Sequence, residues 1–260
     1  KIPSYGIEPI DVPGAPATWA AVNERFGRRS LAENMELAAQ YAENGYPVSP
    51  MMSYLWNEAY GTYTKERETK PEMQGFFDVF CPNGRPLQPG EIFKAPQLAK
   101  TLREIGRTNA ESFYRGELAA RIGDFFKKYN GFLTADDLAA FKPEWVDPIS
   151  VNYRGYDVWE IPPNGHGITV LMALKIMAGF EMRGHEDIET VHRQIEAMKL
   201  AMKDTAEYVT EPSFMKVTAE ELLSDRYATD RRALITDTAM DPQAGDPRYH
   251  STIYFCTADN

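Results

Sequence analysis

The sequence predicts an α+β protein that is mostly helical, and three observations carry this prediction. Apolar residues recur at helical spacing in several segments, most plainly in residues 31–43. The longest apolar run, residues 168–180, has the length of one buried helix. Residues 149–161 instead carry β-branched and aromatic residues around Arg154-Gly155, which predicts a β-hairpin or two short strands.

Local signals place the helices of the first half of the chain. Residues 7–17 are rich in proline and glycine, which predicts an extended entry followed by a turn. Ser30 and Glu33 form a capping-box pattern in front of residues 31–43, and Thr134 is the predicted N-cap of a short helix. The helices predicted for this half cover residues 17–26, 31–43, 51–60, 98–105, 112–129 and 134–141.

The segments between the helices have other patterns. Residues 61–75 interleave basic residues with glutamates, which predicts an exposed loop or lid edge, and the Phe-rich residues 76–80 predict a short strand or a buried loop anchor. Two prolines and an Asn-Gly step predict a turn at residues 81–86. The later predictions are helices at 168–180, 186–208 and 219–233, a linker at 236–250 and a strand at 253–256.

Composition and charge argue against several classes of protein. The 260 residues carry a formal net charge of −10, with 43% hydrophobic and 25% charged residues. These values are ordinary for a globular protein that can bury a sizeable core. The acidic balance argues against a nucleic-acid partner, because phosphate backbones need clustered Lys and Arg. A membrane span needs about 20 apolar residues, more than residues 168–180 provide, so none is expected.

No residue pattern implies a cofactor. The cysteines, Cys81 and Cys256, are too few for a disulfide framework or a paired CxxC zinc site, although one bridge or two buried thiols remain possible. His185 and His192 are seven residues apart and could share a helix face, but a metal hydrolase built on these two with Glu186 and Asp187 is a poor fit. We therefore expect neither a metal nor a cofactor.

The two ends of the chain look cut. It begins with Lys1 instead of Met and stops at Asn260, directly after the last predicted strand. We therefore expect an internal piece of a longer protein. Because such a start would be internal, the missing export signal leaves both a cytoplasmic and an exported location open.

The junction between the predicted linker and the last strand could carry chemistry. Thr252 opens that strand and follows the small polar residue Ser251. N-terminal nucleophile hydrolases need this arrangement, because the Thr hydroxyl attacks the carbonyl before it and the freed amine then serves as the general base. The alternative is that Thr252 is an ordinary β-branched residue of a strand.

The closing segment, Thr252 to Asp259, resembles the processing site of the γ-glutamyltransferase family, including its cephalosporin-acylase-like branch. Other segments fit the same family in the same order, from about Ile10 to the end. These segments are Val12-Pro13-Gly14-Ala15, Arg25-Phe26-Gly27, residues 42–48, Phe113-Tyr114-Arg115-Gly116, residues 131–134 with Asp137-Leu138, Tyr153-Arg154-Gly155-Tyr156, and Ile161-Pro162-Pro163 with Gly167.

The resemblance implies an αββα sandwich made from a large and a small chain, which self-cleavage releases from one precursor. Residues 1–250 would be the C-terminal part of the large chain, and residues 251–260 the processing site and the first strand of the small chain. Thr252 would be the nucleophile and Ser251–Thr252 the cleaved bond.

The resemblance also implies a substrate and a partner. The substrate would be a small γ-glutamyl or acyl amide such as glutathione, and the partner would be the small chain of the same precursor. The family's carboxylate-binding Arg and its oxyanion-hole glycines would lie outside these 260 residues. This stretch alone is expected to be inactive, because the amine of Thr252 is tied up in a peptide bond.

Two departures from the family pattern keep alternatives open. Asn164-Gly165-His166-Gly167 replaces a Ser-Ser-Gly-Gly-like run, and Tyr254 stands where a His is usual. Both changes resemble the acylase-like branch. The alternatives are therefore a cephalosporin-acylase-like amidase, or a non-catalytic helical homologue or binding module.

Several polar residues have simpler interpretations than a site. His166 next to glycines is interpreted as a turn or helix-start residue, although it could line a cleft. Arg154 is interpreted as stabilising a turn, with carboxylate binding as the alternative. Asp136 and Asp137 are helix-start charges that the helix dipole favours.

Overall fold

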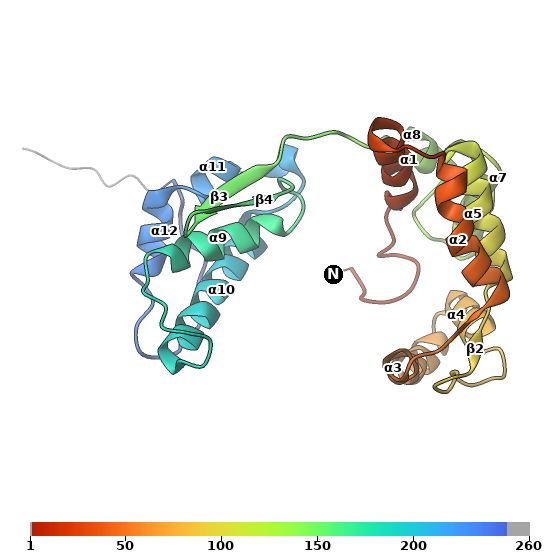
Figure 1. Ribbon diagram of the computed structural model, residues 1–260, viewed down its shortest axis with the longest axis horizontal. Coiled ribbons are helices and arrows are strands. Elements are labelled where there is room, and N and C mark those ends of the chain that lie inside the picture. Colours follow the sequence, from red (N-terminus) through yellow and green to blue (C-terminus); the bar gives the residue numbers. More distant parts are fainter. Residues whose placement is uncertain (1, 249–260) are drawn as a thin grey trace, which may run out of the picture. The chain divides into compact units, whose positions relative to one another are not determined.

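The structure is a computed structural model that describes residues 2–248. The chain divides into two compact units at the junction of Glu144 and Trp145 (Figure 1). The first unit is largely helical, and the second combines a β-hairpin with helices.

The first unit carries most of the helices. They are α1 (Ala15–Phe26), α2 (Leu31–Asn44), α3 (Pro50–Arg67), α4 (Gln74–Phe80), α5 (Pro96–Thr108), α6 (Glu111–Arg115), α7 (Glu117–Lys128) and α8 (Ala135–Ala140), with a 3₁₀ turn at Pro71–Met73. The short strands β1 (Tyr46–Pro47) and β2 (Ile92–Phe93) pair antiparallel. The predicted capping boxes are confirmed, because Ser30 with Glu33 starts α2 and Thr134 with Asp137 starts α8.

Helices α2 and α5 pack closely because small residues line their contact. Gly106 of α5 leaves no room for a side chain, since a Cβ there would lie 2.8 Å from the Cα of Ala32 in α2. The other small residues buried in this contact are Ala39, Ala42 and Ala99.

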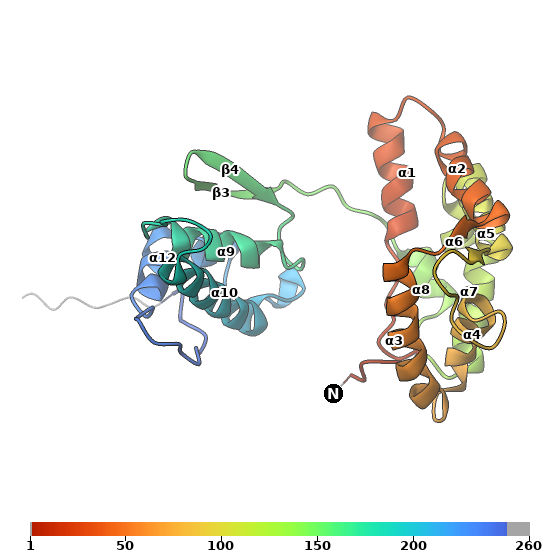
Figure 2. The same cartoon turned by 60° about the horizontal axis from the view of Figure 1, so that its bottom comes forward.

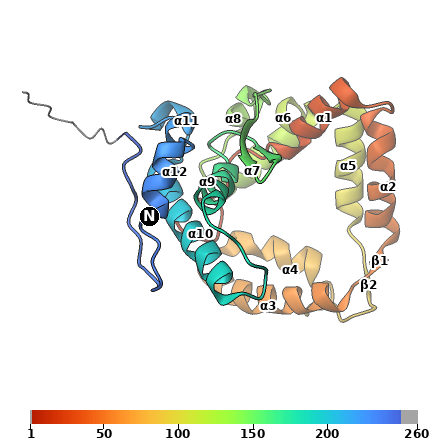
Figure 3. The ribbon, with the colours of Figure 1, turned by 60° about the vertical axis from the view of Figure 1, so that its left-hand side comes forward.

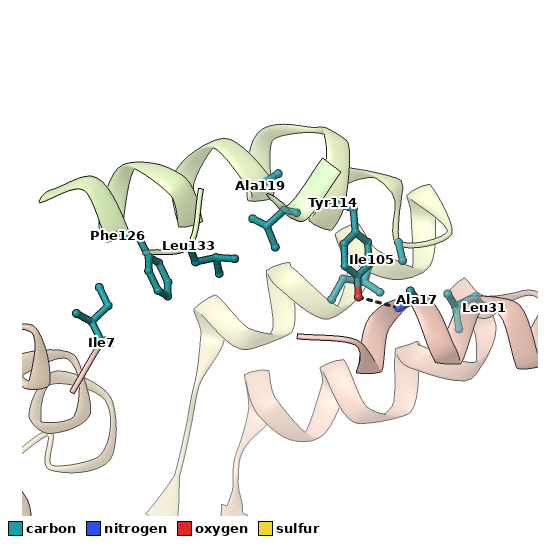
Figure 4. Packing of buried hydrophobic residues seen from close by; sticks show 10 residues of the cluster. Ile7, Ala17, Leu31, Ile105, Tyr114, Ala119, Phe126 and Leu133 are labelled. Atoms are coloured by element: carbon teal, nitrogen blue, oxygen red, sulfur yellow. Dashed lines mark hydrogen bonds between the residues drawn. The ribbon is translucent and has the colours of Figure 1, made fainter. Parts of the chain in front are cut away.

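The main apolar core of the first unit joins α1 and α2 to α5, α6, α7 and α8 (Figure 4). Tyr114 is 2% exposed, and its hydroxyl accepts from the Ala17 N–H at 3.1 Å and donates to the Pro13 carbonyl at 2.5 Å. These bonds tie the start of α1 to α6. The buried residues of the core are Ile7, Ala17, Leu31, Ile105, Ala110, Tyr114, Ala119, Phe126, Leu133 and Leu138.

The predictions for residues 61–67 and 74–80 are wrong, whereas residues 68–73 do form a turn. Helix α3 continues to Arg67, and α4 occupies the place of the predicted strand or loop anchor. Lys, Arg and Glu are good helix formers, and the phenylalanines of α4 fall at helical spacing, so one face of a helix can bury them. Phe80 stacks on Phe93 with ring centroids 5.6 Å apart, and Trp56 meets both rings edge-on.

The single helix predicted for residues 112–129 is also wrong, because Gly116 divides it into α6 and α7. Gly116 has φ −131° and ψ −150°, far from helical values. A Cβ at this position would lie 2.8 Å from the Cα of Ser112. The chain therefore makes a tight turn at a residue without a side chain.

The second unit begins with the hairpin (Figures 1 and 2). Strand β3 (Ile149–Tyr153) pairs antiparallel with β4 (Tyr156–Glu160), with Val151 opposite Val158, which confirms the hairpin prediction. The helices that follow are α9 (Gly167–Ala178), α10 (Ile188–Tyr208), α11 (Ala219–Leu222) and α12 (Asp225–Arg232), with a 3₁₀ turn at Pro212–Phe214. No helix within residues 2–248 has the length and apolar character needed to cross a membrane.

Helix α9 lies at the centre of the second unit, in contact with β3, α10 and α12. Arg232 of α12 donates to the carbonyls of Lys175 and Ile176 at 2.8 and 2.7 Å, which satisfies two acceptors in the last turn of α9. Gly179 follows, and a Cβ there would lie 2.1 Å from the Cζ of Arg232. The close approach of Arg232 therefore depends on a glycine at the end of α9.

The structure corrects the helix predicted for residues 219–233 into α11 and α12. The Ser224 hydroxyl accepts from the Tyr227 N–H at 3.2 Å and caps the start of α12. A serine competes for backbone hydrogen bonds inside a helix, which explains why the chain breaks there. The new start leaves Tyr227 and Arg231 buried on one side of α12.

Candidate processing site and the segment before it

Ser251 and Thr252, the predicted processing bond, lie outside the described residues, which end at Arg248. The structure describes the segment that leads to this bond. Residues 236–248 follow α12 and contain neither helix nor strand (Figure 3). The segment runs along α10, because its contacts begin at His192 near the start of that helix and reach Tyr208 at its end.

Both backbone polar groups of Gly245, its N–H and its carbonyl, are hydrogen-bonded to side chains of α10. Its N–H donates to Oδ1 of Asp204 at 2.9 Å, and its carbonyl accepts from the hydroxyl of Tyr208 at 2.5 Å. A Cβ on Gly245 would lie 2.5 Å from the hydroxyl of Tyr227 and 3.0 Å from the Cδ of Arg231. Gly245 therefore sits in a recess that only a residue without a side chain fills.

Other side chains of α10 and α12 bind further backbone groups of the segment. All of these contacts are made to peptide carbonyls, so they do not depend on the segment's side chains. His192 donates to Thr236 O at 2.7 Å, Lys199 to Met240 O, Arg231 to Gln243 O at 2.8 Å, and Arg226 to Pro247 O at 2.6 Å.

Asp204 and Arg231 form a buried ion pair beneath Gly245. They are 0% and 4% exposed, and Nε of Arg231 lies 3.0 Å from Oδ2 of Asp204. Burial raises the pKa of the Asp204 carboxyl, and the Gly245 N–H and the Arg231 charge oppose that rise. Burial, with the adjacent Asp204 charge, also raises the pKa of Tyr227, so its hydroxyl stays protonated.

Glu196 supports the segment closer to the start of α10. It is 1% exposed, and its carboxylate accepts from Lys199 at 2.8 Å and from the Met240 N–H at 3.3 Å. Burial acts to raise the pKa of Glu196, but these hydrogen bonds outweigh it and lower the pKa. Met240 is thus bound at both its N–H and its carbonyl, as Gly245 is.

The polar residues that were interpreted as turn or helix-start residues lie at turns and helix starts in the structure. His166 is exposed at the N-cap position of α9. Arg154 has φ +54° in the hairpin turn and donates to Phe180 O at 3.1 Å. Asp137 is bound to Thr134 in the capping box of α8.

The residues of the metal-hydrolase alternative have other partners. His185 is exposed and lies 3.7 Å from the exposed Glu186, whereas His192 donates to Thr236 O. Asp187 caps α10 through the Thr190 N–H. Within the part of the chain that the structure describes, no group of three His, Cys, Asp or Glu residues could hold a metal ion.

Of the two cysteines, the structure describes Cys81. Cys81 is a free thiol, and burial raises its pKa. Cys256 lies outside the described residues.

Sequence reasoning missed the residues that hold the segment, although one signal was present. Glu196 and Asp204 occur at helical spacing with Ala197, Leu200 and Ala201, on the buried face of α10. A carboxylate on a buried helix face needs a partner inside the protein. This pattern indicates a buried polar contact but does not identify the partner.

Comparison with known proteins shows what the chain resembles. The sequence model of the family described as Gamma-glutamyltranspeptidase matches residues 1–260. The chain is 36% identical over 261 residues to the "Glutathione hydrolase-like YwrD proenzyme" of Bacillus subtilis (strain 168), covering 99% of this chain and 48% of that protein. The chain thus spans about half the length of the curated relatives it matches.

Solved structures give the same picture. A cephalosporin acylase from Bacillus halodurans matches with a TM-score of 0.90 and 50% identity, over 95% of this chain and 46% of that one. A Helicobacter pylori gamma-glutamyltranspeptidase matches with a TM-score of 0.81 and 28% identity, over 92% of this chain and 68% of that one. These likenesses confirm the predicted α+β, mostly helical part of an N-terminal nucleophile hydrolase fold.

Proposed function

The chain belongs to the γ-glutamyltranspeptidase family, and from that premise we propose that it is part of a self-processing amidohydrolase or acyltransferase whose nucleophile is Thr252. The observation that carries the proposal is the family match over all 260 residues, in a sequence that places Ser251-Thr252 at the start of a predicted strand. Residues 1–250 would belong to the large chain and residues 251–260 would open the small chain, the partner released from the same precursor.

The bonds that change in self-cleavage belong to the threonine and to the peptide bond before it. The Oγ1 of Thr252 adds to the carbonyl carbon of Ser251, the C–N bond breaks, and the amine takes the proton that the hydroxyl loses. Water then hydrolyses the ester, which leaves a carboxylate on Ser251 and restores the hydroxyl of Thr252. The product has a free amine on the same residue as the nucleophile.

In turnover, that amine takes the proton of the Thr252 hydroxyl as the oxygen attacks an amide carbonyl of the substrate. The substrate's amine leaves with a proton, and the acyl group stays on Thr252. Water or an acceptor amine then releases it. The relatives include proteins named glutathione hydrolase and gamma-glutamyltranspeptidase, which supports γ-glutamyl amides such as glutathione as the substrate class.

A second candidate is an amidase that acts on the side-chain amide of a cephalosporin. The observation in its favour is the 50% identity to a cephalosporin acylase, against 28% to the H. pylori gamma-glutamyltranspeptidase. The ratio of kcat/KM for a γ-glutamyl anilide and for a cephalosporin side-chain amide would separate the two candidates.

The test of processing uses the complete gene product. Gel electrophoresis is expected to resolve two chains, with Thr252 as the N-terminal residue of the smaller one by mass spectrometry. Thr252→Ala is expected to leave one chain and no hydrolysis of a γ-glutamyl anilide, and Thr252→Ser to retain cleavage. Thr257→Ala, a threonine of the same segment, is the matched control and should process normally. An uncut wild-type protein that hydrolyses the anilide would contradict the proposal.

A further inference from the structure

The segment before the proposed cleavage site is held by a buried ion pair that the core of the second unit does not by itself require. A buried ion pair such as Asp204 and Arg231 is costly to desolvate, and apolar residues of similar volume often serve a core as well or better. Apolar residues, however, could not form hydrogen bonds with the backbone of the segment. Asp204 accepts from the Gly245 N–H and Arg231 donates to Gln243 O, so both charges are directed at the segment.

The segment itself is suited to being held in this place, because of Gly245 and the prolines on either side of it. The recess beneath Gly245 excludes a Cβ, because the Tyr227 hydroxyl would lie 2.5 Å from it. Pro242 and Pro247 are both buried, and the proline ring fixes φ at each of them. The segment therefore has few conformations to lose when it binds along α10.

The last described hydrogen bond between the segment and a helix lies close in sequence to the proposed scissile bond. Arg226 donates to Pro247 O at 2.6 Å, and Ser251 is four residues further on. Four residues reach at most about 14 Å when fully extended. Holding Gly245 and Pro247 therefore restricts the space in which the Ser251 carbonyl can meet the Thr252 hydroxyl.

We propose that Asp204, Arg231 and Tyr208, together with the recess for Gly245, are positioning residues for self-cleavage at Ser251–Thr252. This inference rests on the proposed function. The anchor acts before the bond is cut, by limiting the segment to conformations from which attack by the Thr252 hydroxyl is possible. It has no part in the later hydrolysis of substrate.

The test compares how fast freshly made precursor of the complete gene product converts to two chains on a gel. Gly245→Ala places a methyl group against Tyr227 and is expected to slow conversion about tenfold or more. Tyr208→Phe removes one hydrogen bond to Gly245 O and is expected to slow it by about three- to tenfold. Gln243→Ala is the matched control, since that exposed residue is held only by its carbonyl, and should convert at the wild-type rate.

Two further readouts distinguish positioning from a loss of structure. The melting temperature of the Tyr208→Phe precursor should stay close to that of wild type. Once a variant has been incubated until it is fully cut, its hydrolysis of a γ-glutamyl anilide per processed molecule should equal that of wild type. A defect in turnover equal to the defect in cleavage would overturn the positioning role.

The outcomes also separate this inference from the proposed function. If folded Gly245→Ala and Tyr208→Phe precursors convert as fast as wild type, the positioning role is wrong, whereas self-processing stands. If Gly245→Ala does not fold, the Tyr208→Phe rate decides alone. If the wild-type protein itself is never cut, the proposed function fails and the inference fails with it.

Discussion

The two units bury polar groups for different purposes. In the first unit, the hydroxyl of Tyr114 links two backbone groups inside a core that is otherwise apolar, and the ion pair of Arg103 and Glu36 lies near the surface. In the second unit, Asp204 and Arg231 are fully enclosed and bind a segment that has no secondary structure. Helices satisfy their own backbone and need only apolar contact to join. An irregular segment has to find its hydrogen-bond partners elsewhere.

The largest effect is expected at the enclosed pair of the second unit. Asp204→Ala leaves Arg231 buried without a counter-charge, and we expect it to lower the free energy of unfolding by about 3–5 kcal/mol. Replacing both residues, as Asp204→Leu with Arg231→Met, should recover most of the loss because no unpaired charge remains. Urea titration followed by circular dichroism measures both.

Asp237→Ala is the control for the loss at Asp204, since it removes an exposed carboxylate of the same unit and should change stability by less than about 0.5 kcal/mol. A loss at Asp204 no larger than this control would mean that the buried pair does not stabilise the second unit.

A smaller effect is expected where the first unit relies on close packing. Gly106→Ala forces a methyl group against the backbone of Ala32, and we expect a loss of about 2 kcal/mol. Gly61→Ala is the matched helical glycine of α3, with no atom within 4 Å of its Cβ position, and should stabilise by about 0.5–1 kcal/mol. The two melting temperatures should therefore move in opposite directions. Equal shifts would contradict the close approach of α2 and α5.

A loss of about 1 kcal/mol is expected for Tyr114→Phe, because the Ala17 N–H and the Pro13 carbonyl lose a buried partner. Native-state hydrogen exchange should also show faster exchange at the Ala17 amide. Tyr41→Phe, an exposed tyrosine of α2, serves as the control and should leave both measurements unchanged. An unchanged Ala17 exchange rate in Tyr114→Phe would show that the hydroxyl does not hold the start of α1.

The smallest effect is a pH dependence at a surface turn of the first unit. Hydrogen bonds from Arg85, and then from the Gln88 N–H, lower the pKa of Glu91 from 4.5 to about 2. Because the folded pKa lies below the unfolded one, this stabilisation is present above about pH 4.5 and is lost as the pH falls through about 2. The stability difference between wild type and Glu91→Gln should thus be constant near neutral pH and vanish near pH 2. A difference that persists at pH 2 would contradict the lowered pKa.

Local chemistry made much of the fold predictable. Ser30 with Glu33 and Thr134 with Asp137 mark helix starts that the structure reproduces, because a capping box satisfies its hydrogen bonds within four residues. The β3–β4 hairpin is equally local. The predicted helices are wrong where two local signals compete. At Gly116 and Ser224 the chain ends one helix and starts another, although the helical spacing of the apolar residues alone predicts a continuous helix.

In the candidate site, too, neighbouring residues allowed a prediction, whereas contacts between distant residues did not. The expectation that Thr252 is a nucleophile came from residues next to each other in the sequence, and it remains a prediction because that residue lies outside the described part of the chain. The anchor at Gly245 could not be predicted, because Asp204 lies 41 residues away in sequence. Helical spacing places Asp204 on a buried face but says nothing about which distant peptide meets it.

The sequence by itself determined the helical character of the chain, its hairpin, its capped helix starts and the family to which it belongs. All of these depend on residue order over short distances, or on many such matches in a fixed order. Only the tertiary structure decided that α10 and α12 present buried charges to Met240, Gln243 and Gly245. Such a contact depends on how separate helices pack, and a hydrogen-bonded charge gains its strength only once that packing has excluded water.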